Sequence, residues 1–188
     1  QINRITKDET VINIVTVARL HWKKGLEYTL EALALVKQQS IKFSYTIIGE
    51  GDQYERLVFT THQLGLSDNV RFTGKLSPIE VKKALETASI YLQYSIQEGF
   101  CNAVLEAQSM GLLCIVSNAE GLDENVLDSQ TGWVIPKRHP AALAQKILEV
   151  IHLSEEAKHL ITSQAISRVK DTFHLERQQR LFREFYEL

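Results

Sequence analysis

The chain has 188 residues and a formal net charge of −2 at pH 7. This length supports one domain with a sizeable core, and the nearly balanced charge argues against non-specific binding of nucleic acid. No apolar run approaches the roughly 18 residues of a membrane-spanning helix. The two cysteines, Cys101 and Cys114, suggest neither a disulfide framework nor a zinc site, which fits a cytoplasmic protein.

Short apolar runs rich in β-branched residues alternate with segments of helical periodicity along the chain. The runs that we predict to be strands are 12–18, 43–48, 70–73, 90–93, 112–117 and 132–135. The segments that we predict to be helices are 26–39, 53–64, 78–87, 103–110, 140–153, 155–171 and 175–186, with a short helical turn after Gly121. This alternation predicts right-handed βαβ units, and therefore an α/β, Rossmann-like fold with a doubly wound parallel six-stranded sheet and helices on both faces.

Residues 98–111 read EGFCNAVLEAQSMG and hold two carboxylates eight positions apart, Glu98 and Glu106. Asn102 is a good N-cap and Gly111 a good C-cap for the helix between them. The start of such a helix offers free N–H groups and a partial positive charge, which suit a phosphate. Carboxylates accept paired hydrogen bonds, so they suit the diols that flank the pyrophosphate of a nucleotide sugar. From spacing alone, solvated surface carboxylates are the commoner interpretation.

Arg19 and Lys24 follow the first predicted strand and could supply the positive charge for such a ligand. Arg can hold a phosphate through two parallel hydrogen bonds, and Lys adds a point charge. On a loop, two such residues are more often solvated charges. Ligands of doubly wound sheets bind at the carboxyl ends of the strands. Since Arg19, Gly49, Gly74 and Glu98 all stand at predicted strand ends, we expect them to gather along one edge of the sheet.

The stretch 98–111 resembles the E-x7-E motif of the family-4 (group 1) retaining glycosyltransferases, which have the two-domain GT-B fold. Four further segments resemble that family in the same order: ValAlaArgLeu at 17–20 with Lys24 and Gly25, IleIleGlyGluGly at 47–51, PheThrGly at 72–74 and ThrGlyTrpValIlePro at 131–136. The resemblance implies that residues 11–188 are a nucleotide-sugar (donor) binding domain, one half of a GT-B fold. It also implies that residues 1–10 are a linker remnant and that the N-terminal acceptor domain is absent from this chain.

The resemblance also implies roles for individual residues. Arg19 and Lys24 would bind the donor pyrophosphate and stabilise the leaving nucleoside diphosphate, and Glu98 would contact hydroxyls of the transferred sugar. Glu106 would bind the ribose diol. The backbone N–H groups expected to touch the sugar and phosphates belong to Gly99, Phe100, Cys101, Asn102 and Ala103. The base is expected near Gly74, Lys75 and Leu76.

Cys101 stands where many family members have Pro or Gly, which is a departure from the family pattern. We expect no metal and no cofactor, because no Asp-x-Asp pair is present.

The implied reaction is retaining transfer of a hexose-type sugar to an acceptor hydroxyl, in polysaccharide or glycolipid synthesis. A nucleotide-sugar epimerase, a phosphorylase-like GT-B enzyme and a non-catalytic nucleotide-binding module remain open as alternatives. No sequence feature marks the lysine that a phosphorylase needs for pyridoxal phosphate. We expect the isolated chain to be inactive, because the acceptor would bind the missing domain. Any membrane contact of the full-length protein would be made by that domain.

Overall fold

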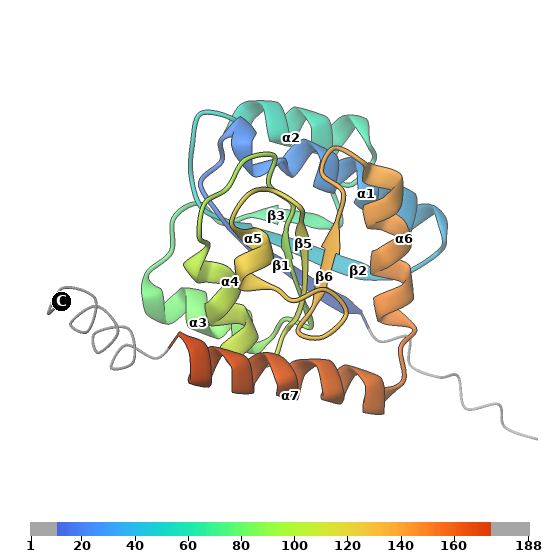
Figure 1. The fold of residues 1–188 in the computed structure, drawn as a ribbon. Helices are drawn as coiled ribbons and strands as arrows, with labels where there is room; N and C mark the ends of the chain where they lie inside the picture. The colour runs from blue at the N-terminus through green and yellow to red at the C-terminus, as the bar shows by residue number, and fades with distance from the viewer. Residues whose placement is uncertain (1–10, 174–188) are drawn as a thin grey trace, which may run out of the picture.

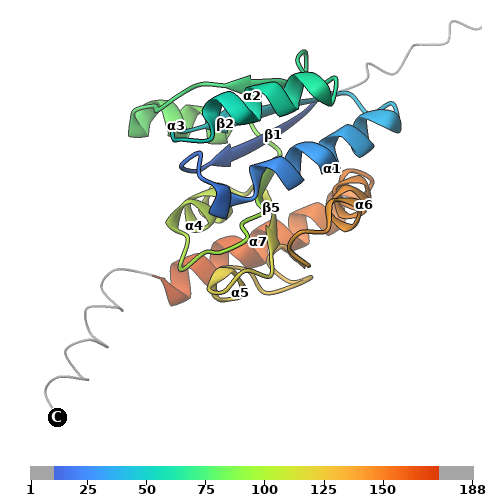
Figure 2. The same cartoon turned by 90° about the horizontal axis from the view of Figure 1, so that it is seen from above.

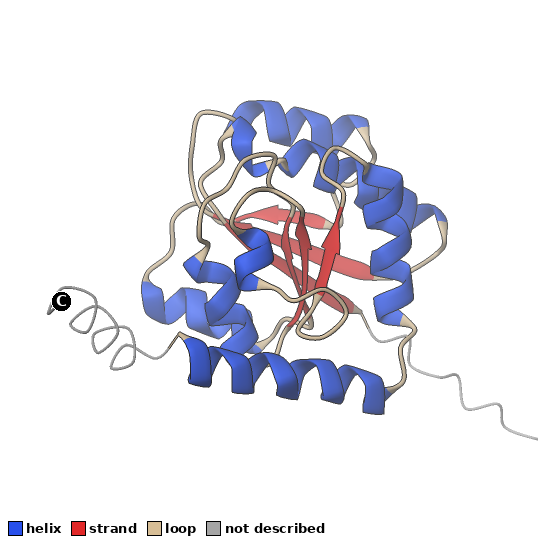
Figure 3. Cartoon of the chain, in the orientation of Figure 1, coloured by secondary structure: helices blue, strands red, loops and turns tan. Residues whose placement is uncertain are grey.

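The structure is a computed structural model that describes residues 11–173. Six strands form one sheet in the order β3-β2-β1-β4-β5-β6, and every pair is parallel (Figure 3). The strands are β1 (Ile12–Val17), β2 (Phe43–Ile48), β3 (Val70–Phe72), β4 (Ile90–Gln93), β5 (Leu113–Ser117) and β6 (Trp133–Ile135). The predicted doubly wound parallel sheet is therefore confirmed.

Helices cover both faces of the sheet. They are α1 (Leu26–Gln38), α2 (Tyr54–Gln63), α3 (Pro78–Glu86), α4 (Asn102–Ser109), α5 (Leu122–Asn125), α6 (Pro140–Ile151) and α7 (Glu155–Thr172), together with the 3-10 helix η1 (Trp22–Lys24). In Figure 1, α1, α2 and α6 lie above and to the right of the sheet, and α3, α4 and α7 lie below and to the left. Figure 2 shows that α7 runs past α4, with which it makes direct contact.

Successive strand residues supply two separate cores. In β1, Ile14 joins the cluster under α1 and α6, whereas Val15 joins the cluster under α3 and α4. In β5, Ile115 joins the first cluster, and Cys114 and Val116 join the second. Side chains alternate across a strand, so a sheet that is covered on both faces needs apolar residues at consecutive positions. This requirement explains the unbroken apolar runs of the sequence.

The observed elements begin and end within two residues of the predicted ones, with two further differences. Residues 22–24 were expected to be a loop but form η1. Asn102 was expected to be the N-cap of α4, but Cys101 holds that position with an extended backbone (φ −108°, ψ 100°), and Asn102 is the first helical residue. The predicted linker 1–10 and the predicted helix 175–186 lie outside the described residues.

Helix α4 ends at the glycine that the sequence pointed to. Gly111 has a φ of +79°, which a residue with a side chain rarely adopts. The N–H of Gly111 donates to the carbonyl of Gln108 (3.0 Å), and the N–H of Leu112 donates to the carbonyl of Ala107 (3.1 Å). This pair of bonds is a Schellman motif. It turns the chain sharply from α4 into β5, so the start of α4 stays at the carboxyl edge of the sheet.

Helix α3 begins with a capping box between Ser77 and Glu80, in which each residue bonds the backbone N–H of the other. Hydrogen bonds from the Ser77 side chain and backbone lower the pKa of Glu80 below its ordinary value of 4.5. A carboxyl whose pKa is lower in the folded state stabilises the fold above the unfolded-state pKa. This contribution is lost as the pH falls through the folded-state pKa.

Replacing Ser77 by Ala is therefore expected to lower the free energy of unfolding more at neutral pH than in acid. The variant keeps the backbone N–H donor to Glu80 but loses the hydroxyl donor, whose bond is stronger when the carboxylate is charged. Denaturant unfolding of both proteins at neutral pH and at a pH below 4.5 measures the difference. A difference that stays constant with pH would contradict the capping-box assignment.

Candidate functional site

The strand order places a switch point between β1 and β4. Strands β1, β2 and β3 lie side by side in the order in which they occur in the chain. Strand β4 then pairs with the opposite edge of β1. In open α/β sheets, ligands bind outside the carboxyl ends of the strands at such a point. A cavity of about 700 Å³ opens there, and its lining residues are Arg19, His21, Lys23, Lys24, Gln97, Glu98 and Gly99. This volume is in the usual range for a small-molecule site.

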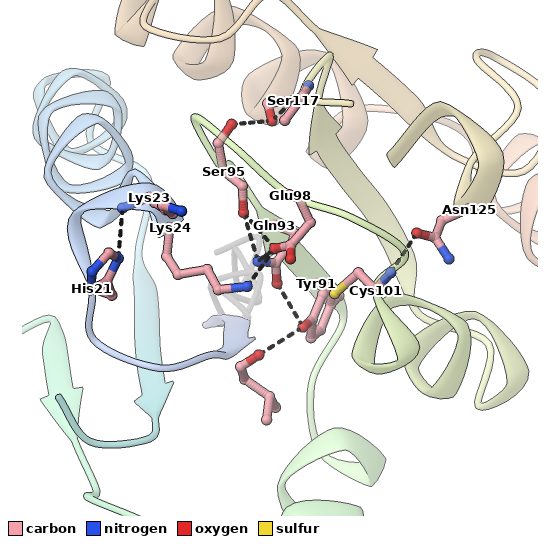
Figure 4. A network of polar contacts seen from close by, with 12 residues as sticks. His21, Lys23, Lys24, Tyr91, Gln93, Ser95, Glu98, Cys101, Ser117 and Asn125 are labelled. Carbon is pink, nitrogen blue, oxygen red and sulfur yellow. Dashed lines mark hydrogen bonds and ion pairs between the residues drawn. The ribbon is translucent and has the colours of Figure 1, made fainter. Parts of the chain in front are cut away.

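An ion pair between Lys24 and Glu98 joins the two loops of this cavity. The Nζ atom of Lys24 lies 2.5 Å from Oε2 of Glu98 (Figure 4). The two side chains are 22% and 12% exposed, so water screens the pair only in part. The loops are also joined through their backbones, because the N–H of Ile96 donates to the carbonyl of Lys23 (2.7 Å). Both charges are thus held in place by contacts within the chain.

Two further donors hold the same oxygen of Glu98. The Oγ atom of Ser95 and the Nε2 atom of Gln93 donate to Oε2 at 2.9 and 3.2 Å. Behind them, the buried Tyr91 hydroxyl donates to Oε1 of Gln93 (3.1 Å), and burial raises the pKa of Tyr91 well above its ordinary value, so this donor keeps its proton (Figure 4). Within residues 11–173, Lys24, Ser95 and Gln93 all bond Oε2 of Glu98, and none of these three donors bonds Oε1.

Sequence reasoning missed Gln93 and Ser95. A signal for them existed, because Gln93 is the last residue of an otherwise apolar buried strand, where a polar side chain needs a specific partner. Ser95 follows two positions later, on the same side of the extended chain. Ser95 is itself positioned from β5, since its carbonyl accepts from the hydroxyl of Ser117 (2.5 Å). No spacing rule links Ser117 to Ser95.

The structure brings together Arg19, Lys24, Glu98 and Gly99 from the predicted site, as the cavity lining shows. The other predicted residues do not line this cavity: Gly74, Lys75, Leu76, Phe100, Cys101, Asn102, Ala103 and Glu106. Glu106 is exposed on α4, five residues into the helix counting Asn102 as the first. At a rise of about 1.5 Å per residue, that places it about 6 Å along the axis from the helix start. Its role toward a ligand stays a prediction.

Cys101 has a structural role at the start of α4. Its backbone N–H donates to Oδ1 of Asn125 (2.9 Å), so this amide already has a partner inside the chain. Burial raises the pKa of the Cys101 thiol, which therefore stays neutral at pH 7 and is a poor nucleophile. The residue serves as the N-cap of α4 and contributes to the core beneath it. Cys114 is also buried.

Residues 11–173 contain no group of three His, Cys, Asp or Glu side chains placed to hold a metal ion. No helix in this part of the chain is long and apolar enough to cross a bilayer. That the site works without a metal stays a prediction.

Comparisons with known proteins agree with this geometry. The family model described as glycosyl transferases group 1 matches residues 1–165. AmsK of Erwinia amylovora, named as an amylovoran biosynthesis glycosyltransferase, is 35% identical over 145 residues, which cover 74% of this chain and 36% of AmsK. WcaL of Escherichia coli (strain K12), named for colanic acid biosynthesis, is 31% identical over 171 residues, which cover 88% of this chain and 42% of WcaL. The chain therefore spans less than half the length of these curated relatives.

The fold is shared with solved structures. Anabaena Alr3699/HepE, solved in complex with UDP-glucose, superposes with a TM-score of 0.85 at 21% sequence identity, over 95% of this chain and 50% of that one. This likeness confirms the Rossmann-like half of a GT-B fold that the sequence resemblance implied. Because the family model covers most of the chain and the sheet, switch point and cavity agree with it, the chain belongs to the group 1 glycosyl transferases.

Proposed function

We propose that the chain is the donor-binding half of a retaining glycosyltransferase. It would bind a nucleotide-diphosphate sugar and transfer a hexose-type sugar to an acceptor hydroxyl in polysaccharide or glycolipid synthesis. The observation that carries the proposal is the Lys24–Glu98 ion pair in a polar cavity at the switch point of the sheet. The names of AmsK and WcaL, and the UDP-glucose bound to HepE, support the same class of reaction.

The cations of the cavity suit the leaving group. When the bond between the sugar and the diphosphate breaks, negative charge grows on the leaving oxygens. Arg19 and Lys24 line the cavity from the β1 side, and fixed positive charge there would stabilise that developing charge. Lys24 can share its ammonium between Glu98 and a phosphate, because it has three donors. On this proposal the reaction needs no divalent metal ion.

Glu98 is suited to orient the sugar. Its Oε2 atom is held by Lys24, Ser95 and Gln93, which fixes the direction of Oε1. A hydroxyl of the transferred sugar would donate to Oε1. The N–H groups at the start of α4 would face the phosphates, Glu106 would take the ribose diol, and the base would lie near residues 74–76.

We propose that an N-terminal domain binds the acceptor and makes any membrane contact, and that the full-length enzyme works in the cytoplasm. The chain would then bind the donor without transferring its sugar. Sugar transfer by this chain alone would contradict that division of labour.

Calorimetric titration of the chain with UDP, GDP and ADP, first without metal and then with Mg²⁺, tests the proposed function. We expect one nucleoside diphosphate to bind without metal, which would also identify the base. Binding that appears only with Mg²⁺ would contradict metal independence. If none of the three binds under either condition, the chain is not an autonomous donor domain.

Replacing Glu106 by Ala is expected to weaken nucleoside diphosphate binding by about 1–3 kcal/mol, since charge-assisted hydrogen bonds to the ribose would be lost. The same titration measures the effect. Glu155→Ala on α7 is the matched control, because it removes an exposed helix carboxylate whose partner is Lys158, and it should leave the affinity unchanged. Equal affinities of the Glu106 variant and the unmodified chain would show that Glu106 does not bind the ribose.

A further inference from the structure

The short helix α5 touches the back of the loop 99–101 at two points. At the first point, the N–H of Cys101 donates to Oδ1 of Asn125, the last residue of α5, which is fully buried (Figure 4). At the second, a Cβ atom added to Gly121 would lie 2.6 Å from the carbonyl carbon of Gly99. Such a distance is shorter than any ordinary contact, so only a glycine permits this approach. The loop that follows Glu98 therefore rests directly on the side chain of Asn125 and on Gly121, the N-cap of α5.

Helix α7 holds α5 from the other side. The guanidinium of Arg168 donates to the carbonyls of Asn125 (2.8 Å) and Glu124 (2.6 Å), which lie at the end of α5. The same guanidinium lies over the ring of Phe173, 5.0 Å from its centroid, and that ring lies 5.3 Å from the ring of Phe100. Phe100 and Cys101 are thus both tied to α7, one through an aromatic contact and one through Asn125.

The amide of Asn125 is an unusual choice for this position. Its Nδ2 atom is buried and has no hydrogen-bond partner within residues 11–173. A buried polar group without a partner destabilises a fold, so its presence calls for an explanation. An aliphatic side chain of similar size would fill the space without that penalty but could not accept the N–H of Cys101. Asn125 therefore contributes the hydrogen bond to the N–H of Cys101, which no aliphatic residue could form.

We propose that Asn125 is a positioning residue for the donor site, acting through the N–H of Cys101, and that Arg168 holds it in place. The inference rests on the proposed function, because it concerns the loop between Glu98 and the first N–H groups of α4. Fixing the peptide at Cys101 sets the direction in which the adjacent amides of Phe100 and Asn102 point. Asn125 does not line the cavity, and it would influence the ligand only through this loop.

A matched pair of variants tests the proposal, Asn125→Ala and Asn118→Ala. Asn118 makes the same kind of bond elsewhere, since its Oδ1 accepts from the N–H of Lys137 (2.8 Å). In the ligand-free chain, hydrogen exchange of the Cys101 amide should become at least about tenfold faster in Asn125→Ala and stay unchanged in Asn118→Ala. Nucleoside diphosphate affinity should fall about 3- to 10-fold in Asn125→Ala only, the loss expected for one hydrogen bond.

Two further variants separate positioning from folding. Asn125→Leu keeps a side chain of similar size but has no acceptor oxygen, so exchange at the Cys101 amide should be as fast as in Asn125→Ala, which a loss of packing alone would not predict. Arg168→Lys keeps a positive charge but loses the fork that bonds two carbonyls at once. It should speed exchange of the loop even where Asn125→Ala fails to fold.

The outcomes distinguish this proposal from the function on which it rests. Unchanged exchange in both Asn125→Ala and Arg168→Lys would overturn the positioning role, whether or not a nucleotide binds. Faster exchange with unchanged affinity would also overturn it, since the loop would then not act on the ligand. If the unmodified chain binds no nucleoside diphosphate, the donor-site proposal fails and the positioning role fails with it, while the exchange data still report whether Asn125 holds the loop.

Discussion

Replacing Lys24 by Met is expected to weaken binding of a nucleoside diphosphate by about 10- to 100-fold. A hydrogen bond to a charged group contributes about 1.5–3 kcal/mol, and about 1.4 kcal/mol is a factor of ten. Lys24 is held 2.5 Å from Glu98 at the cavity, so its ammonium is already in place when the ligand arrives. Its loss would also leave the carboxylate of Glu98, which is only 12% exposed, without a countercharge near the incoming phosphates. Calorimetric titration measures the change.

Two controls sharpen this experiment. Lys82→Met removes a largely exposed lysine whose partner is Glu86 on the same helix, and it should leave the affinity unchanged. The bare nucleoside should bind the Lys24 variant as well as it binds the unmodified chain, because it has no phosphate. Equal losses for the nucleoside and the diphosphate would show that Lys24 supports the site in general and does not contact phosphate.

Replacing Gly25 by Ala is expected to destabilise the fold by about 2–5 kcal/mol. Gly25 has a φ of 61° and joins η1 to α1. A left-handed backbone at a residue with a side chain costs about 1–2 kcal/mol. A Cβ atom would also lie 2.1 Å from the carbonyl oxygen of Tyr94, and relieving such an overlap in a packed region costs about 1–3 kcal/mol more. Denaturant unfolding of the two proteins gives the difference in free energy.

Gly65→Ala is the matched control for this effect. Gly65 has a similar φ of +66°, but nothing lies within 4 Å of the place where its Cβ atom would be. Its substitution should therefore cost only the backbone contribution, about 1–2 kcal/mol. The additional loss in free energy of unfolding for Gly25→Ala, compared with Gly65→Ala, measures the close approach of the loops that follow β1 and β4. This approach brings Lys24 to Glu98. Equal losses at the two glycines would contradict that close approach.

The sequence alone was enough to predict the elements of this fold and their class. Consecutive apolar residues in β1 and β5 can be buried only in a sheet covered on both faces, and this requirement is local. Glycines such as Gly111 mark places where the backbone needs a positive φ, which is also a local property. The family resemblance then pointed to Arg19, Lys24 and Glu98, and the structure places all three around one cavity.

Two predictions of local structure were wrong, at the N-cap of α4 and at residues 22–24. The expectation for Asn102 followed a side-chain preference for the N-cap, but the backbone turns helical one residue earlier, after Cys101. Propensity is a weak guide where tertiary contacts hold the loop, and here Asn125 holds the N–H of Cys101. Residues 22–24 form η1 because Gly25 ends that turn with a left-handed backbone, which periodicity does not report over so few residues.

The sequence by itself determined that this protein is a parallel α/β domain of a glycosyltransferase type with charged residues at its strand ends. The tertiary structure alone decided which of those charges meet. Lys24 and Glu98 are 74 residues apart and become neighbours only because β4 is inserted beside β1. The same holds for Asn125 and Cys101, and for Ser117 and Ser95. The periodicity of apolar residues predicts helices and strands because it reflects local backbone geometry. Contacts between distant residues depend instead on which strands lie side by side in the sheet.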